Sequence, residues 1–252
     1  MEFIKINSGT DILVGAHHKN ESSNVVAIIL HGFMSANRIG PYRLYFQIAD
    51  ALERNGINVF RMDCAGCGES AHDGVITQEL FLKNVEDILK YVKGRGYDEI
   101  HIIGHCFGAN VALYLNSKVD WIASVSAISP TPLDDANKNK IFSKEILESW
   151  VGETIERRSM VVHKSFLGGI FDYAMFSKHL EVNRDKIYAH IPINDKYVFV
   201  DTLTNTLSEK GVRFTVYEEC DHHFLNGPPR LKLINSIVER ILGRNHLDKN
   251  MP

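Results

Sequence analysis

The chain has 252 residues, of which 44% are hydrophobic and 23% are charged, so it can bury a core large enough for one α/β domain. Its 28 basic and 31 acidic residues form no long runs and give a net charge of −3, which argues against partners such as nucleic acid or an anionic membrane. No apolar run approaches the ~20 residues of a membrane span, and the N-terminus lacks signal-peptide features, so we expect a cytoplasmic protein.

The four cysteines lie at positions 64, 67, 106 and 220. A reducing compartment would keep them as thiols. Cys64 and Cys67 have the C-x-x-C spacing of redox and metal-binding pairs. No second pair with metal spacing accompanies them, so we expect neither a metal nor another cofactor.

The first half of the chain predicts strands that alternate with helices. Residues 2–7 and 11–18 should form an antiparallel hairpin, because a cluster of turn residues separates them. The later strands are apolar runs, as in a parallel sheet buried on both faces, and are expected at 24–30, 57–62, 99–103 and 121–128. The helices have apolar residues at helical spacing and are expected at 41–55, 77–93 and 109–115. This alternation predicts a doubly wound α/β sheet.

Two polar loops follow predicted strands. His31 and Gly32 come directly after an apolar run, where a turn could aim the amide of Phe33 at an oxyanion. An ordinary turn from strand to loop would explain this pattern equally well. The second loop, 63–70, has the spacing D-x-x-G-x-G-x-S, and we expect Asp63 to hold it by hydrogen bonds rather than to act on a substrate. In this interpretation Cys64 and Cys67 are loop fillers.

Residues 104–108, with the sequence GHCFG, lie between a predicted strand and a predicted helix. This is the context of a G-x-S-x-G nucleophile elbow, with cysteine in the place of serine. The glycines permit a turn so sharp that side chains at their positions would collide with the strand and the helix. Such a turn would present Cys106 at a helix N-terminus, whose dipole favours a thiolate. A small buried cysteine under a glycine-rich turn is the alternative.

Residues 133–183 break the alternation of strands and helices. We expect them to form a cap, inserted into the single domain that spans residues 1–252, because they contain an unusual concentration of aromatic side chains. His105, in the elbow, is expected either to pack beside the turn or to line the pocket. The residues expected to bind the substrate are therefore His105, Trp150, Phe166, Phe171 and Tyr173. A surface excursion without substrate contact is the alternative for the insertion.

The sheet is predicted to resume after the insertion. Strands are expected at 186–192 and 213–217, with a helix that ends at Leu207 between them and a closing helix at 228–242. The two strands lead into Asp195 and into the doublet His222 and His223, respectively.

Five segments make the chain resemble the α/β-hydrolase family over nearly its whole length. They follow predicted strands in the family's order, at 31–33, 63–70, 104–108, 194–198 and 221–224. Within the family the chain is similar to the cinnamoyl or feruloyl esterase branch, and its cysteine resembles that of dienelactone hydrolases. The resemblance implies an α/β-hydrolase fold: a mostly parallel, eight-stranded sheet with helices on both faces and a small cap.

The resemblance also implies a catalytic triad and an oxyanion hole, formed by Cys106, His222 and Asp195 and by the amides of Phe33 and Phe107. The glycine that usually precedes the acid in this family is missing here, so Asp134 or Asp135, after the preceding strand, stays open as the acid. His223 stays open as the base, although the family's D-H-x-F pattern falls on His222.

A cysteine nucleophile favours some acyl substrates over others. With an oxygen ester, the thiolate leaves the tetrahedral intermediate more easily than the alkoxide, whereas with a thioester both leaving groups are thiolates. We therefore expect a thioesterase or acyltransferase with an acyl-Cys intermediate, and a substrate on coenzyme A or an acyl carrier protein. The alternatives are a carboxylesterase of the cinnamoyl or feruloyl type, a dienelactone-hydrolase-like lactonase and a non-catalytic binding protein. A homodimer is also left open.

Overall fold

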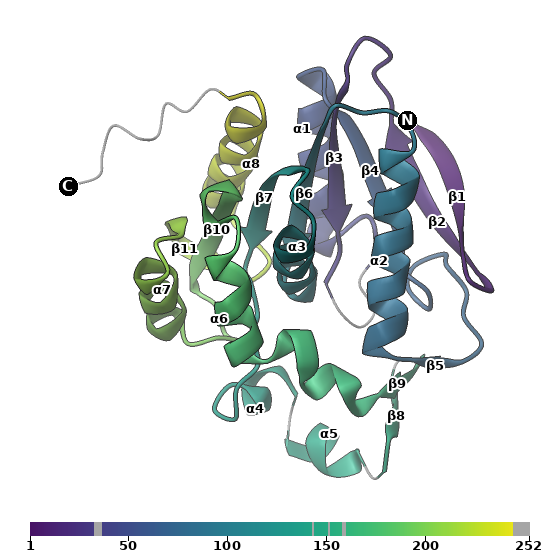
Figure 1. The fold of residues 1–252 in the computed structure, drawn as a ribbon. Helices are drawn as coiled ribbons and strands as arrows, with labels where there is room; N and C mark the ends of the chain where they lie inside the picture. Colours follow the sequence, from purple (N-terminus) through teal and green to yellow (C-terminus); the bar gives the residue numbers. More distant parts are fainter. Residues whose placement is uncertain (33–36, 143, 151, 158–159, 244–252) are drawn as a thin grey trace.

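An eight-stranded sheet forms the centre of the protein (Figure 1). The computed structural model describes residues 1–32, 37–142, 144–150, 152–157 and 160–243. The strands lie in the order β1 (Glu2–Ser8), β2 (Asp11–His18), β4 (Asn58–Met62), β3 (Val25–Leu30), β6 (Glu99–His105), β7 (Ile122–Ile128), β10 (Ile187–Asn194) and β11 (Arg213–Asp221). β2 pairs antiparallel with β1 and β4, and every other neighbouring pair in this sheet is parallel. The predicted hairpin and the predicted doubly wound sheet are therefore confirmed.

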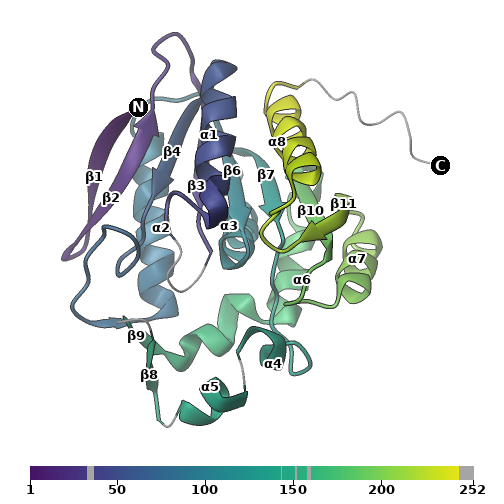
Figure 2. The same cartoon turned by 180° about the vertical axis from the view of Figure 1, so that it is seen from behind.

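Helices cover both faces of the sheet. One face carries α2 (Gln78–Lys93), α3 (Phe107–Lys118), α6 (Tyr173–Glu181) and α7 (Val200–Glu209). The opposite face carries α1 (Leu44–Arg54) and α8 (Gly227–Ile241), which lie side by side in Figure 2. Each face has its own hydrophobic core, because the central parallel strands present apolar side chains in both directions.

Two helix starts show how local chemistry sets the boundaries. The Thr77 hydroxyl accepts a hydrogen bond from the Leu80 amide at 3.1 Å, which caps α2 where a helix was expected. The helix expected from residue 41 begins only at Leu44, so that prediction was wrong by three residues. Tyr42 and Arg43 have φ angles of 47° and 64°, and a left-handed backbone cannot belong to a right-handed helix.

The segment between β7 and β10 forms a group of short elements beyond one end of the sheet (Figure 1). They are α4 (Lys138–Ile141), α5 (Lys144–Ser149), β8 (Thr154–Arg157), β9 (Met160–His163) and two 3-10 turns (Lys164–Leu167 and Gly169–Phe171), followed by α6. β8 and β9 make a small second sheet with β5 (Val75–Ile76). The Gln78 side chain ties this segment to α2, because its amide donates hydrogen bonds to the carbonyls of Ser165 and Gly168 at 3.0 and 2.8 Å.

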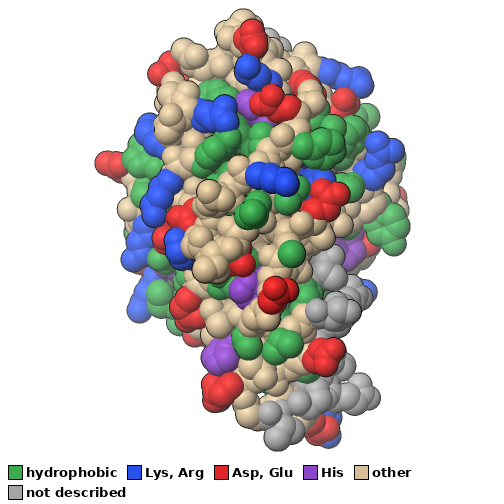
Figure 3. Space-filling model, turned by 90° about the vertical axis from the view of Figure 1, so that its right-hand side faces the viewer, with side chains coloured by type: hydrophobic (Ala, Val, Ile, Leu, Met, Phe, Trp, Pro, Cys, Tyr) green, Lys and Arg blue, Asp and Glu red, His purple; other side chains and the backbone are tan. Residues whose placement is uncertain are grey.

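One face of the molecule carries a mixture of charged and apolar side chains. Figure 3 views the molecule from the side on which β1 and β2 lie in Figure 1, and basic, acidic and apolar side chains are mixed there. Among the described residues, no helix is both long enough and apolar enough to cross a membrane.

Phe171 should contribute strongly to stability, because its ring is fully buried and meets Phe107 on α3 edge to face at 4.5 Å. We expect Phe171→Ala to lower the free energy of unfolding by about 3–5 kcal/mol in urea titrations followed by circular dichroism. The matched control is Phe3→Ala, which removes a ring that is 71% exposed and should change stability by less than about 0.5 kcal/mol. Equal effects of the two substitutions would contradict the packing role of Phe171.

Candidate active site

Cys106 lies at a sharp turn between β6 and α3. Its backbone has φ 57° and ψ −125°, a strained conformation for a residue with a side chain. A Cβ atom on Gly104 would lie 2.6 Å from the Ala109 Cα, and one on Gly108 would lie 2.5 Å from the His31 carbonyl oxygen. Both contacts are too close, so the turn requires glycine at these two positions. Residues 104–108 thus have the geometry of a nucleophile elbow.

Asp195 and His222 form a buried pair directly after the neighbouring strands β10 and β11, respectively. The His222 Nδ1 lies 2.7 Å from the Asp195 Oδ2, and the other carboxylate oxygen accepts a hydrogen bond from the Tyr197 amide at 2.9 Å. The pair follows from the register of the sheet, because Asn194 lies opposite Asp221 and the residue after each of them is a member of the pair. Since a carboxylate only accepts, Nδ1 carries the proton and Nε2 remains for chemistry.

The electrostatics couple Cys106 to this pair. Burial alone would lower the pKa of His222, but the charge of Cys106 and hydrogen bonds to Asp195 and Cys106 outweigh it and raise the pKa to about 10. A positively charged His222 stabilises a thiolate at Cys106. The Thr131 hydroxyl also lies 3.6 Å from the Cys106 Sγ.

Of the residues that the sequence left open as acid and base, the two aspartates are engaged by other residues, whereas His223 lies beside His222. Asp134 accepts a hydrogen bond from the Asn137 amide at 2.7 Å, and the exposed Asp135 pairs with Lys138 at 3.3 Å. His223 packs edge-on against His222, and its Nδ1 has no partner among the described residues. The carboxylate that contacts the His222 ring is therefore Asp195.

The two predicted oxyanion donors belong to the loop after β3 and to the start of α3. Phe33 falls outside the described residues. Its neighbour Gly32 lies directly against Cys106, because a Cβ atom there would come within 3.2 Å of the Cys106 Cβ. Phe107 is the first residue of α3, directly after Cys106. The start of the Gly32 loop and the start of α3 therefore meet at the elbow.

The structure corrects the role expected for most of the aromatic residues. Phe166 and Phe171 are fully buried and stack on each other at 5.7 Å, so they pack the insertion onto α2 and α3. The Tyr173 hydroxyl points to α7, where it lies 2.6 Å from the Thr206 hydroxyl. Trp150 is half-buried and packs edge-on against Phe142 at 5.7 Å. Phe166, Phe171 and Tyr173 are therefore not assigned substrate contact, because other residues of the protein engage their side chains.

His105 packs beside the elbow turn, which is one of the two places expected for it. It is buried, and its Nδ1 and Nε2 lie 2.8 Å from the Tyr45 hydroxyl and 2.9 Å from the His222 carbonyl oxygen. Both ring nitrogens therefore have protein partners, and His105 lies beneath the site rather than on its wall. Ring nitrogens of His105, His222 and His223 come within 4.8 Å of one another. Both nitrogens of His105 and the Nδ1 of His222 already have protein partners.

The loop after β4 has the structural role that we expected. The Asp63 carboxylate accepts hydrogen bonds from the amides of Arg38 and Glu69 at 2.5 and 3.1 Å, and it pairs with the Arg38 guanidinium. Cys64 and Cys67 are buried free thiols beside it. Burial raises the pKa of the Cys67 thiol to about 12 and that of Cys64 well above its usual value.

Three residues of the site were not predicted from the sequence. Thr131 is clamped by Asn110, which donates to its carbonyl and accepts from its amide, both at 3.0 Å. Ser129, with φ 46°, donates its hydroxyl proton to the His222 carbonyl at 3.0 Å. A signal for these two existed, because polar residues directly after β7 must lie at the same sheet edge as the elbow. Tyr45, inside α1, carried no such signal.

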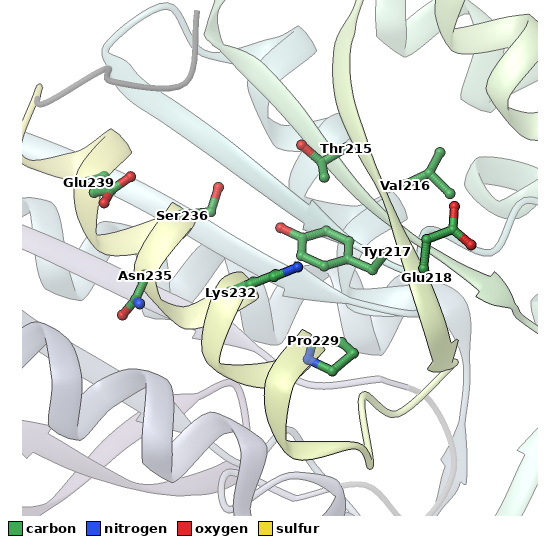
Figure 4. Close-up of a pocket in the computed structure, with 9 residues that line it drawn as sticks. All are labelled: Thr215, Val216, Tyr217, Glu218, Pro229, Lys232, Asn235, Ser236 and Glu239. Atoms are coloured by element: carbon green, nitrogen blue, oxygen red, sulfur yellow. The ribbon is translucent and has the colours of Figure 1, made fainter. Parts of the chain in front are cut away.

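A pocket of about 480 Å³ lies away from these residues, between β11 and α8 (Figure 4). Its lining consists of Thr215, Val216, Tyr217, Glu218, Pro229, Lys232, Asn235, Ser236 and Glu239. None of the residues around Cys106 contributes to it.

A known protein family matches a large part of this sequence. The model of the family described as alpha/beta hydrolase fold matches residues 26–166, which is more than half of the chain. The chain belongs to the α/β hydrolase fold family. The prediction of this fold is therefore confirmed.

Solved structures with this fold cover nearly all of the chain. The α/β hydrolase Est1E from Butyrivibrio proteoclasticus, in a structure with ferulic acid bound, has a TM-score of 0.78 at 14% identity and covers 96% of this chain and 98% of its own. The Pyrococcus furiosus esterase Pf2001 has a TM-score of 0.71 at 21% identity, with 96% and 90% covered. A curated relative, the proline iminopeptidase of Clostridioides difficile (strain 630), is 30% identical over 98 residues, which is 38% of this chain and 31% of that protein.

In this α/β hydrolase, iodoacetamide should alkylate Cys106 before any other cysteine. Burial raises the pKa of Cys67 and Cys220 to about 12, so at pH 8 only about one molecule in 10⁴ would carry a thiolate at either position. A time course of alkylation, followed by peptide mass spectrometry, measures the four rates separately. Equal rates at Cys64, Cys67, Cys106 and Cys220 would rule out an activated thiolate.

Proposed function

We propose that this α/β hydrolase is an acyl-transfer enzyme that forms an acyl intermediate on Cys106 and takes an acyl thioester as substrate. One observation carries the proposal: a cysteine occupies the strained elbow, within hydrogen-bonding reach of a histidine that is paired with a buried carboxylate. Nucleophile, base and orienting acid in this arrangement are the recurring parts of covalent acyl transfer.

In the first step the Cys106 thiolate attacks the carbonyl carbon of the thioester. The carbonyl oxygen becomes an oxyanion, for which the amides of Phe33 and Phe107 are the proposed donors. As the substrate's carbon–sulfur bond breaks, the protonated Nε2 of His222 gives its proton to the departing thiolate. The products of this step are a free thiol and an acyl group on the Cys106 sulfur.

In the second step an acceptor, either water or an amine, attacks the acyl-Cys106 thioester. The neutral Nε2 of His222 removes a proton from the acceptor, and the Cys106 thiolate leaves as the acid or amide forms. Asp195 keeps the Nδ1 proton in place throughout and stabilises the imidazolium. The cycle therefore returns the thiolate and imidazolium pair with which it began.

The identity of the nucleophile favours a thioester over an oxygen ester. An intermediate that carries both a thiolate and an alkoxide expels the thiolate more readily, so an oxygen ester tends to revert unless the alkoxide is protonated in time. With a thioester the two departing groups are equivalent, and transfer onto Cys106 is close to thermoneutral. Coenzyme A and acyl carrier proteins both present acyl groups as thioesters, so we propose either as the source of the substrate.

A carboxylesterase of the feruloyl type is the second candidate. The similarity of the fold to that of Est1E, which binds ferulic acid, favours it. The burial of Phe166 and Phe171 weakens it, because these rings pack the insertion rather than offer a surface to an aromatic acyl group. A non-catalytic role is disfavoured by the intact hydrogen bond between His222 and Asp195, which a binding protein has no need to keep.

Substitutions of the proposed acid and base should separate them from their neighbours. Asp195→Asn should lower turnover by roughly 10³–10⁴, because the amide NH2 can donate to Nδ1 and so stabilise the tautomer that carries its proton on Nε2. His222→Ala should abolish turnover. His223→Ala and Asp134→Asn are the matched controls and should stay close to the wild-type rate. Severe loss in either control with normal rates in Asp195→Asn and His222→Ala would mean that the site was assembled from the wrong residues.

The preference for thioesters can be measured with matched acyl groups. We expect the wild type to process a thioester at least ~10-fold faster than the alkyl oxygen ester, which corresponds to about 1.4 kcal/mol in the barrier. Cys106→Ser should narrow or invert this preference, because a hydroxyl nucleophile does not suffer the unfavourable partition.

The acceptor is tested in the same assay by adding a primary amine. Product should shift from free acid to amide, while the rate of acyl-enzyme formation, followed by intact-protein mass spectrometry, stays unchanged. Equal rates on alkyl esters and thioesters, together with no amide product, would favour the carboxylesterase.

A further inference from the structure

A chain of side-chain hydrogen bonds connects the loop after β3 with the turn after β11. The Gly32 amide lies 3.3 Å from the Tyr45 hydroxyl oxygen. The same hydroxyl lies 2.8 Å from the His105 Nδ1, and the His105 Nε2 lies 2.9 Å from the carbonyl oxygen of His222. All four residues are buried, so water does not compete for these bonds.

The groups at the two ends of this series of hydrogen bonds determine the direction of every bond in the series. A backbone N–H can only donate and a carbonyl can only accept. The Gly32 amide therefore donates to Tyr45, whose single hydroxyl proton goes to the His105 Nδ1. The His105 Nε2 must then carry the proton that is donated to the His222 carbonyl. Burial, together with the nearby charge of His222, lowers the pKa of His105 well below its usual value, which keeps this ring neutral.

We propose that Tyr45 and His105 are positioning residues. They hold the backbone of Gly32, which precedes the proposed oxyanion donor Phe33, and the catalytic histidine at a fixed separation across Cys106. This inference rests on the proposed function, in which His222 is the base and Gly32 precedes the proposed oxyanion donor Phe33. The sheet alone does not set this separation, since β3 and β11 are separated by three other strands, β6, β7 and β10. A misplacement of about 1 Å in a reacting group can cost roughly 10²-fold in rate.

The hydrogen bond from His105 restrains the backbone of His222 rather than its ring. Its carbonyl accepts from the His105 Nε2 and from the Ser129 hydroxyl at 3.0 Å, so two donors fix the turn that carries the imidazole. The imidazole itself is held by Asp195. Ring and backbone of the catalytic histidine are thus restrained independently.

A second tyrosine and histidine pair in the same protein offers a matched comparison. The buried Tyr217 hydroxyl lies 2.9 Å from the His190 Nδ1, which reproduces the contact between Tyr45 and His105. The His190 Nε2, however, has no partner among the described residues, so this pair does not extend to the catalytic turn. Tyr217 lines the pocket beside α8 instead (Figure 4).

The first test compares Tyr45→Phe with Tyr217→Phe. Each substitution removes one buried hydroxyl and leaves one histidine Nδ1 without its hydrogen-bond partner. We expect Tyr45→Phe to lower kcat about tenfold with KM changed less than twofold, and Tyr217→Phe to leave both constants within twofold of the wild type. Melting temperatures show whether the two variants lose similar stability. Equal kcat values for the two variants would overturn the proposal.

The second test needs no substrate, so it separates this proposal from the proposed function. His105→Leu should slow alkylation of Cys106 by iodoacetamide at least fivefold, because His222 loses a restraint. His105→Gln keeps an N–H that can reach the His222 carbonyl and should restore the rate to within twofold. A His105→Leu variant with the wild-type rate of alkylation would overturn the positioning role, whether or not the enzyme turns over any ester.

A spectroscopic measurement on the unsubstituted protein covers the case in which His105→Leu does not fold. Proton–nitrogen correlation spectra of protein labelled with ¹⁵N-histidine should show His105 as neutral, with its proton on Nε2, between pH 5 and 8. A proton on Nδ1, or a ring that titrates in this range, would contradict the direction of the chain and overturn the proposal.

Discussion

The close packing of α3 against the ends of β6 and β3, at Gly104 and Gly108 respectively, is the constraint on which the site depends. It forces Cys106 into a backbone conformation that costs on the order of 1–3 kcal/mol. The surrounding sheet supplies this energy, since the Cys106 amide is bound to the Ile128 carbonyl at 2.9 Å and cannot relax. The strain directs the thiol toward the carboxyl edge of the sheet, where the loops that carry the other site residues converge.

The electrostatics of the site follow from burial combined with complete hydrogen bonding. A buried imidazole would ordinarily be neutral, as His190 is, whose pKa burial lowers to about 3. His222 behaves in the opposite way because Cys106 and Asp195 both stabilise its charged form. The same protein therefore holds one buried histidine that is neutral and one that favours the charged form, and the difference lies in their partners. The chain through Tyr45 and His105 adds a third kind of histidine, neutral and used as a spacer.

The insertion shows how one set of side chains can serve packing instead of recognition. Its aromatic rings were expected to contact the substrate, because the unusual concentration of aromatic side chains in residues 133–183 predicted a cap. Phe166 and Phe171 instead join Phe81 and Phe107 in a cluster that fastens the insertion to α2 and α3. Composition reveals that such rings will be buried, but it does not reveal whether the protein or a ligand buries them.

The alternation of apolar runs and helical periods determined the order of strands and helices. Parallel strands end at a common edge, so the sequence also placed the elbow and the segments with Asp195 and His222 at one edge of the sheet. The choice of Asp195 and His222 within those segments came from the resemblance to the α/β-hydrolase family. The tertiary structure alone decided which carboxylate meets His222, because the register of β10 against β11 brings Asp195 beside it and leaves Asp134 with Asn137. It alone also decided the roles of Tyr45, Ser129 and His105, whose contacts join segments separated by up to 117 residues. No local propensity encodes such contacts, because they exist only after the sheet has closed and buried the groups that make them.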